Sequence, residues 1–173
     1  MAERGPRRRG GARNEAGAAL VEFALVVPIL LILVFGIIEF GLAFNDYIAV
    51  RNGSREGARV AVVNDVNNAP SCTISGGIVS PPAAPTGASD ATNAVVCKTK
   101  DRIGLDQSQV KVKVSISGYS IGDTVTVCAS YPVTSISGIL APIISGKTLT
   151  SNVTMRLEQV PKFASFTEAG TAC

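Results

Sequence analysis

The chain has 173 residues, an apolar fraction of 46% and a net charge of +3, which leaves room for one modest domain with an appendage. The charge is uneven, because residues 1–17 hold five arginines against two glutamates and the rest of the chain is therefore neutral. Since the basic charge is confined to this short head, it gives no argument for a nucleic-acid partner.

Residues 1–17 are rich in glycine and arginine and show no apolar periodicity, so we expect them to be disordered. The segment 23–38 that follows contains 16 consecutive residues without a charge. A helix over residues 18–43 is about 39 Å long, enough to cross a hydrocarbon core of about 30 Å. Arginines just before a membrane segment hold that flank in the cytoplasm. The pattern predicts a single-pass inner-membrane anchor with its N-terminus inside and its C-terminal part exported.

Two carboxylates flank this apolar run. Glu22 stands at its start, and a charge beside an apolar membrane segment is costly unless it has a partner. Glu22 is therefore either a functional residue or a solvated group at the headgroup layer. Glu39 lies about 25 Å further along the helix, near the outer interface. We expect Glu39 to reach water there, and contact with a neighbouring subunit is the alternative. Pro28 predicts a kink, since it removes a backbone hydrogen bond and clashes with the preceding turn.

The apolar segment carries the motifs of a known family. From Ala16 the chain reads Ala-Gly-Ala-Ala-Leu-Val-Glu-Phe-Ala-Leu-Val-Val-Pro-Ile-Leu, and from Phe35 it reads Phe-Gly-Ile-Ile-Glu-Phe-Gly. A later run from Ser54 reads Ser-Arg-Glu-Gly-Ala-Arg. A basic leader that ends in Gly, with Glu five positions later, resembles the type IV prepilin signal. The three runs together resemble the TadE-like family, minor pilins or pseudopilins of tight-adherence (Flp-type) pilus systems.

This resemblance implies a set of roles and partners. A prepilin peptidase would cut between Gly17 and Ala18, and Glu22 would then be the fifth mature residue. Its carboxylate would pair with the α-amino group of a neighbouring subunit and set the register between helices, and Glu39 is a second candidate for subunit assembly. The implied partners are the peptidase, other pilins and minor pilins, the inner-membrane assembly platform and membrane lipid.

The helical pattern continues past the membrane to Val63. Arg51, Arg55 and Arg59 recur every four residues and form one basic stripe, which is either a solvated face or a contact with a partner. Glu56 is spaced to pair with Arg59. Turn-forming residues from Asn64 onward end the helix.

The remaining residues predict a small α+β domain. A short helix is expected from Ser89 or Asp90 to Arg102, and alternating apolar residues predict strands over 109–117, 124–131 and 148–159. We expect a pilin-like α+β fold, in which the distal half of the long helix packs on a three-stranded antiparallel meander. The segments are a leader (1–17), the long helix (18–63), a loop with the short helix (64–106), the sheet (107–160) and a C-terminal tail (161–173).

Four cysteines lie beyond the apolar run, and they allow three disulfide pairings. Cys72–Cys97 would staple a loop and Cys128–Cys173 would tie down the tail, so we favour this pairing over free buried thiols. No pair has CxxC spacing and the chain has no histidine, so we expect no metal site.

No catalytic constellation is recognisable, since nucleophile pairs that need histidine are excluded and no phosphate-binding loop is present. We therefore expect no enzyme and no cofactor. The function predicted is that of a minor pilin or pseudopilin in a pilus for surface attachment. The alternative is a membrane-anchored surface protein that does not polymerise and whose β-rich exported domain binds a ligand.

Overall fold

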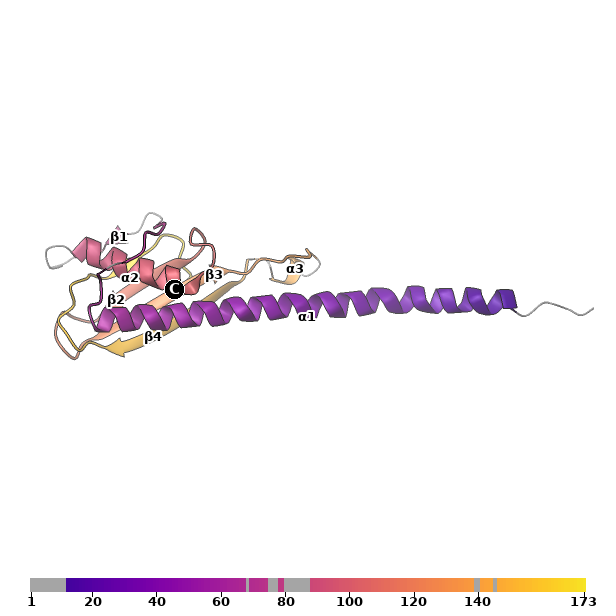
Figure 1. Ribbon diagram of the computed structural model, residues 1–173, viewed down its shortest axis with the longest axis horizontal. Helices are drawn as coiled ribbons and strands as arrows, with labels where there is room; N and C mark the ends of the chain where they lie inside the picture. The colour runs from indigo at the N-terminus through magenta and orange to yellow at the C-terminus, as the bar shows by residue number, and fades with distance from the viewer. Residues whose placement is uncertain (1–11, 68, 75–77, 80–87, 139–140, 145) are drawn as a thin grey trace, which may run out of the picture.

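The computed structural model describes residues 12–67, 69–74, 78–79, 88–138, 141–144 and 146–173. Most of the expected leader and most of the Gly- and Pro-rich loop before residue 88 lie outside these residues. The fold is α+β: one long helix stands free over its first half and packs on an antiparallel sheet over its second (Figure 1).

Helix α1 runs over Ala12–Val62 and is 51 residues long. Residues 12–17 are therefore helical, and their expected disorder was wrong. Alanine, arginine and glutamate in this short stretch favour helix, so the apolar helix extends by more than one turn toward its N-terminus. The helix ends within one residue of the expected position. Asn64 follows it in the left-handed conformation (φ 52°), and its side chain binds the backbone of Val160 and Lys162.

Helix α2 (Ala88–Ile103) crosses the distal part of α1 at close range. Two glycines on α1 permit this approach, because a Cβ on Gly53 would overlap Ile103 and one on Gly57 would overlap Thr99. Gly104, with φ 69°, follows α2 in the left-handed conformation that glycine adopts readily at helix ends.

The sheet is built on the predicted meander of β2 (Lys111–Ile116), β3 (Thr124–Pro132) and β4 (Thr148–Arg156). Two short strands, β1 (Ile78–Val79) and β5 (Phe166–Thr167), extend it to the order β1-β5-β2-β3-β4 within the described residues. The expected count of three strands was therefore too low. Each added strand has two residues, which is too short for an alternating pattern to show.

The core lies between the two helices and one face of the sheet. The predicted inward residues Val112, Val114, Val125 and Val127 are fully buried there, and Val127 pairs with Val114 on one side and Val153 on the other. Residues 161–173, expected as a tail, contribute to this core as well. Their buried members are Pro161, Phe163, Ala164, Phe166 and Glu168.

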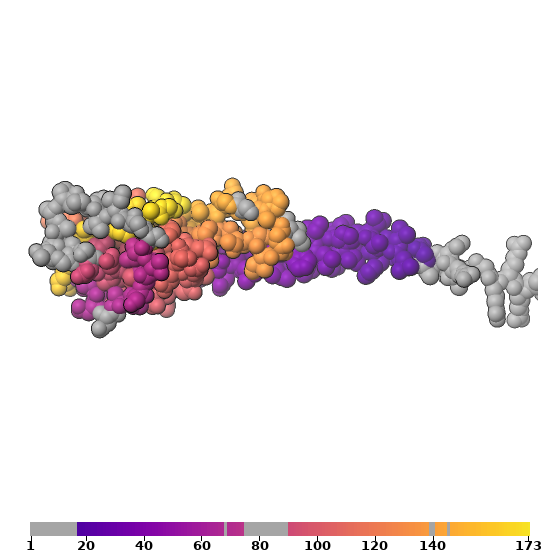
Figure 2. Space-filling model, turned by 90° about the horizontal axis from the view of Figure 1, so that it is seen from above, coloured from indigo at the N-terminus to yellow at the C-terminus, as the bar shows by residue number. Residues whose placement is uncertain are grey.

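The connection from β3 to β4 forms a projection that we call the arm: residues 133–138, 141–144, 146 and 147. It includes the one-turn helix α3 (Ala141–Ile144). The arm leaves the head and lies beside α1, on the side toward the N-terminal half of that helix (Figures 1 and 2).

Candidate functional site

The N-terminal half of α1 presents an apolar surface that no other described element covers. Its best 18-residue window has a mean hydropathy of 2.9 and no buried residue. Phe23, Leu25 and Ile29, for example, are each about two-thirds exposed. Monomeric soluble proteins rarely expose a contiguous apolar patch of this kind, which marks contact with membrane or protein. The helix is long and apolar enough to cross a bilayer and suggests a membrane anchor.

The predicted cleavage and assembly residues lie together at the start of this surface. Gly17, Ala18 and Glu22 are all exposed. Apart from its chain neighbours and the backbone of its own helix, no described atom would come within 4 Å of a Cβ added to Gly17. Glu22 makes no ion pair or hydrogen bond with another described side chain. The carboxylate thus adjoins an apolar helix with no partner from its own described chain.

Pro28 lies inside α1, which continues through it as one element. Figure 1 draws α1 as one continuous helix, and the kink expected at Pro28 stays a prediction for the helix in its membrane or filament surroundings.

Glu39 differs most from expectation, since it is only 7% exposed. Its Oε1 accepts hydrogen bonds from Ser135 Oγ (2.8 Å), from the backbone N–H of Ser137 (2.9 Å) and from Ser137 Oγ. Its Oε2 is buried without a hydrogen-bond partner among the described residues. The expected solvated position was therefore wrong, because the arm folds back over this carboxylate and replaces the water. Glu39 and Ser135 lie 96 positions apart, and the sequence around either residue gives no sign that they meet.

The basic stripe of Arg51, Arg55 and Arg59 is exposed along the distal part of α1. Glu56 binds Arg59 at 2.6 Å, in the i,i+3 pair that the spacing predicts. Arg102 of α2 lines the same open groove as Arg55 and Arg59. Val153 and Met155 form the apolar side of this groove. Arg55 and Arg59 of the stripe therefore form, together with Arg102, a basic groove between α1, α2 and β4. Arg102 carried no signal in the sequence, since its place depends on how α2 crosses α1.

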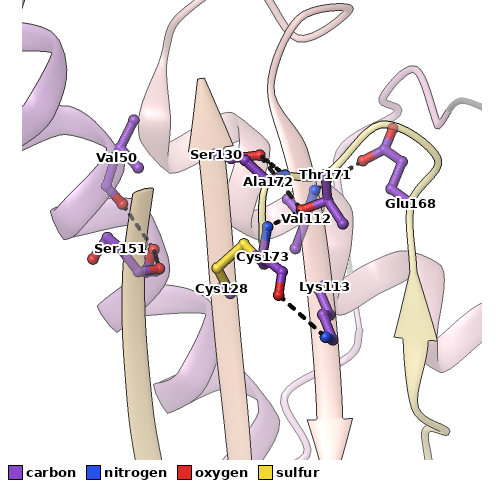
Figure 3. The surroundings of a disulfide bond; sticks show 11 residues. Val50, Val112, Lys113, Cys128, Ser130, Ser151, Glu168, Thr171, Ala172 and Cys173 are labelled. Atoms are coloured by element: carbon purple, nitrogen blue, oxygen red, sulfur yellow. Dashed lines mark hydrogen bonds between the residues drawn. A yellow bond between two sulfur atoms is a disulfide. The ribbon is translucent and has the colours of Figure 1, made fainter. Parts of the chain in front are cut away.

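The disulfides join Cys72 to Cys97 and Cys128 to Cys173, which is the pairing favoured from the sequence. The second bond holds the C-terminus on the sheet face opposite the helices, next to Lys113 and Ser130 (Figure 3). The Ser130 hydroxyl accepts a hydrogen bond from the backbone N–H of Ala172 at 3.2 Å, so the chain end is tied at several points.

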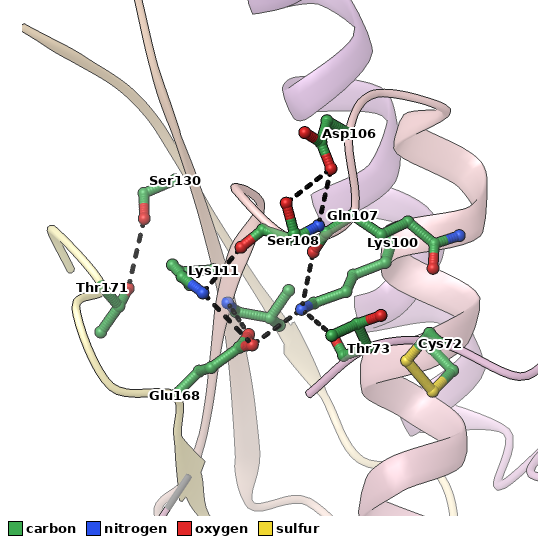
Figure 4. A network of polar contacts seen from close by, with 12 residues as sticks. Cys72, Thr73, Lys100, Asp106, Gln107, Ser108, Lys111, Ser130, Glu168 and Thr171 are labelled. Carbon is green, nitrogen blue, oxygen red and sulfur yellow. Dashed lines mark hydrogen bonds and ion pairs between the residues drawn. A yellow bond between two sulfur atoms is a disulfide. The ribbon is translucent and has the colours of Figure 1, made fainter. Parts of the chain in front are cut away.

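A buried ion pair between α2 and the residues that follow β5 could not be predicted from the sequence. Lys100 of α2 and Glu168, which follows β5, are both fully buried, with Nζ and Oε1 2.7 Å apart. The ammonium group also donates to the carbonyls of Thr73 and Gln107, and Glu168 Oε2 accepts from the N–H of Val112 (Figure 4). The pair joins α2, β2, β5 and the loop that Cys72 pins, so it holds the head together rather than forming a site open to a ligand.

Among the described residues, no group of three or more His, Cys, Asp and Glu side chains could hold a metal ion. The features that stand out are instead an uncovered apolar helix, carboxylates at its two ends, and a small disulfide-bonded head.

Together these features suggest a membrane anchor followed by an α+β head. A family model described as TadE-like protein matches residues 17–59, about a quarter of the chain and all of it within α1. This match confirms the resemblance to the TadE-like family and links the chain to tight-adherence pilus systems; that family is not an enzyme family. The comparison with curated proteins found no match, and neither did the comparison with solved structures.

Proposed function

We propose that the chain is a minor pilin or pseudopilin that a prepilin peptidase processes between Gly17 and Ala18, and that then takes part in building a tight-adherence pilus. The observation that carries this proposal is the agreement between the family match and the exposed helix. The match begins at Gly17, and Glu22 stands five positions later, without a partner among the described residues, on an apolar surface that no other described element covers.

The surroundings of Gly17 support processing at this bond. Gly17 lies in the second turn of α1, close to the helix end where the first backbone N–H groups lack intrahelical partners. Glycine also disfavours helix by about 1 kcal/mol relative to alanine. Since no described side chain lies within 4 Å of the Cβ position of Gly17, the helix can unwind there into a peptidase at small cost.

The proposed orientation places the leader in the cytoplasm and the head outside. The arginines of residues 1–17 favour the cytoplasmic side. From Ala18 to Glu39 the helix rises about 31 Å at 1.5 Å per residue. This rise equals the thickness of a hydrocarbon core of about 30 Å, so Glu39 and the head begin at the outer boundary.

Glu22 has a direct chemical role in this proposal. Cleavage creates a positively charged α-amino group on Ala18, and a neighbouring subunit in the filament would offer that group to the Glu22 carboxylate. Each charge would satisfy the other in a poorly solvated setting. Removing one partner of a buried pair costs about 3–5 kcal/mol, which is enough to decide whether a subunit packs in register.

The other proposed contacts lie outside the bilayer. Arg51 and Arg55 are exposed and make no ion pair among the described residues, so they are available to acidic groups on a partner pilin. The assembly platform and the peptidase would meet the cytoplasmic end of α1. In this proposal Glu39 orders the subunit's own arm and does not contact a second subunit.

The test is a Glu22→Ala variant expressed in place of the natural chain in a piliated strain. We expect it to reach the membrane and to be cleaved, but to be lost from the sheared pilus fraction or to reduce the number of pili. Glu158→Ala is the matched control, because that carboxylate is exposed on the head. Wild-type piliation and wild-type incorporation of the Glu22→Ala variant would refute the assembly role.

A further inference from the structure

The arm carries two of the most exposed apolar side chains of the head. Ile136 is 75% exposed and Ile143 is 71% exposed. In the sequence, residues 132–146 contain no charge, and Lys147 is the first charged residue after them. An uncharged projection with isoleucines facing outward is typical of a surface that meets an apolar partner.

The contact with Glu39 sets the level of the arm along α1. Ser135 and Ser137 both bind this carboxylate, and Glu39 closes the uncharged run of the helix. Glu39 lies about 31 Å of helix beyond Ala18, which is the thickness of the hydrocarbon core. The arm is thus held at the height where a bilayer surface would cross α1.

The direction in which the arm projects agrees with this level. In two views related by a quarter turn, the arm leaves the head and lies beside α1 toward its N-terminal half (Figures 1 and 2). The neighbouring helix surface is itself apolar and exposed, with Phe40 at 73% and Leu42 at 42%. The isoleucines of the arm therefore lie at the same level along α1 as exposed apolar side chains of the helix itself.

We propose that the arm is a membrane-interface element that lays Ile136 and Ile143 into the outer boundary of the lipid bilayer. Apolar side chains held in the interface plane bind where headgroups meet acyl chains. Lys147, at the end of the arm, is placed to meet the phosphates of the lipid headgroups. With α1 crossing the bilayer and the arm lying on it, the head has two attachments, which fix its rotation and its height above the membrane.

This inference rests on the membrane orientation proposed above, and it names lipid as the partner because the arm is bound to α1 at Glu39, where the uncharged run of the helix ends. A second copy of the chain could also cover isoleucines, and the experiment separates these partners.

The chain contains no tryptophan, so single tryptophans introduced by substitution report cleanly. The full chain is placed in vesicles of phosphatidylcholine and phosphatidylglycerol that carry a nitroxide quencher just below the headgroup. Ile143→Trp and Ile136→Trp probe the arm, and Phe35→Trp probes the membrane segment. Ile121→Trp is the matched control, because Ile121 is 69% exposed in the turn at the opposite end of β3.

We expect the two arm variants to show blue-shifted emission and to lose most of their fluorescence to the lipid quencher. The fluorescence of Ile121→Trp should be neither shifted nor quenched. Arm variants quenched no more than Ile121→Trp, with Phe35→Trp strongly quenched, would overturn the arm proposal and leave the anchor intact. A blue shift in the arm that depends on protein concentration, without lipid quenching, would also overturn it and assign the arm to a second copy. If Phe35→Trp itself escapes the quencher, the membrane orientation fails first.

Discussion

Replacing Glu168 with glutamine tests how the head is held together. The substitution keeps the size of the side chain, and its carbonyl oxygen can still accept from the N–H of Val112. Among the described residues it removes the only full negative charge within 3 Å of Lys100 Nζ. That ammonium group would keep the carbonyls of Thr73 and Gln107 at 2.6 and 3.2 Å. The ammonium group would then be buried without a counter-charge.

The expected loss is large, because breaking a buried ion pair by removing one partner costs about 3–5 kcal/mol. For a chain of 173 residues, each kcal/mol lowers the melting temperature by about 2–4 °C, so we expect a fall of about 6 °C or more. Asp65→Asn is the matched control. It breaks the Lys98–Asp65 pair, also about 3 Å long, whose carboxylate is half exposed. Such a pair contributes at most about 1 kcal/mol.

The assay is urea denaturation of the full chain in detergent with both disulfides intact, followed by the fluorescence of its three tyrosines. We also expect Lys100→Met combined with Glu168→Gln to recover part of the loss, because the double variant leaves no buried charge. A Glu168→Gln variant whose unfolding free energy lies within about 1 kcal/mol of the natural chain would refute the reasoning, since it would mean that the pair is solvated.

Two further predictions concern the long helix. Gly57→Ala should destabilise the head by about 1–3 kcal/mol in the same urea assay, since the added methyl overlaps Thr99 where α2 crosses α1. Gly41→Ala, where nothing lies within 4 Å, should be neutral or slightly stabilising, and equal effects of the two substitutions would contradict the close crossing. Glu39→Ala should speed hydrogen exchange at the Ser137 amide by about tenfold or more, because that N–H loses a charged acceptor. Unchanged exchange in this variant would show that the carboxylate does not hold the arm.

The local parts of the fold could be predicted from the sequence. The alternation through Val110, Val112 and Val114 placed β2 and its inward face correctly, because side-chain direction in a strand has a period of two. The long apolar helix could be predicted from its uncharged run, and the end of α2 from Gly104, since glycine adopts the left-handed conformation readily. In each of these elements the pattern lies within a few neighbouring residues.

The parts that escaped prediction depend on contacts between distant residues. Lys100 and Glu168 lie 68 positions apart, and each reads as an ordinary surface charge in its own segment. Glu39 and Ser135 lie 96 positions apart. The close packing of α1 and α2 does have a signal in the sequence. Gly53 and Gly57 are four residues apart, and this spacing of small residues lets two helices approach closely.

The candidate site also has a part that the sequence predicts and a part that depends on contacts between distant residues. Gly17, Ala18 and Glu22 could be identified because their motif is contiguous, and the structure adds that they stand exposed at the start of an uncovered helix. The burial of Glu39 and the position of Arg102 in the basic groove could not be predicted, since both depend on how the head packs on α1.

The most direct test of the central claim is the N-terminal residue of the mature protein, read by sequencing or intact mass from membranes of a cell with an active prepilin peptidase. Processing as proposed predicts a chain that begins at Ala18 and lacks the basic leader. It also predicts that Gly17→Val, a change at an exposed position where no packing is lost, leaves the leader in place. A natural chain that still begins at Met1 in such cells would contradict the pilin account and leave a plain membrane anchor.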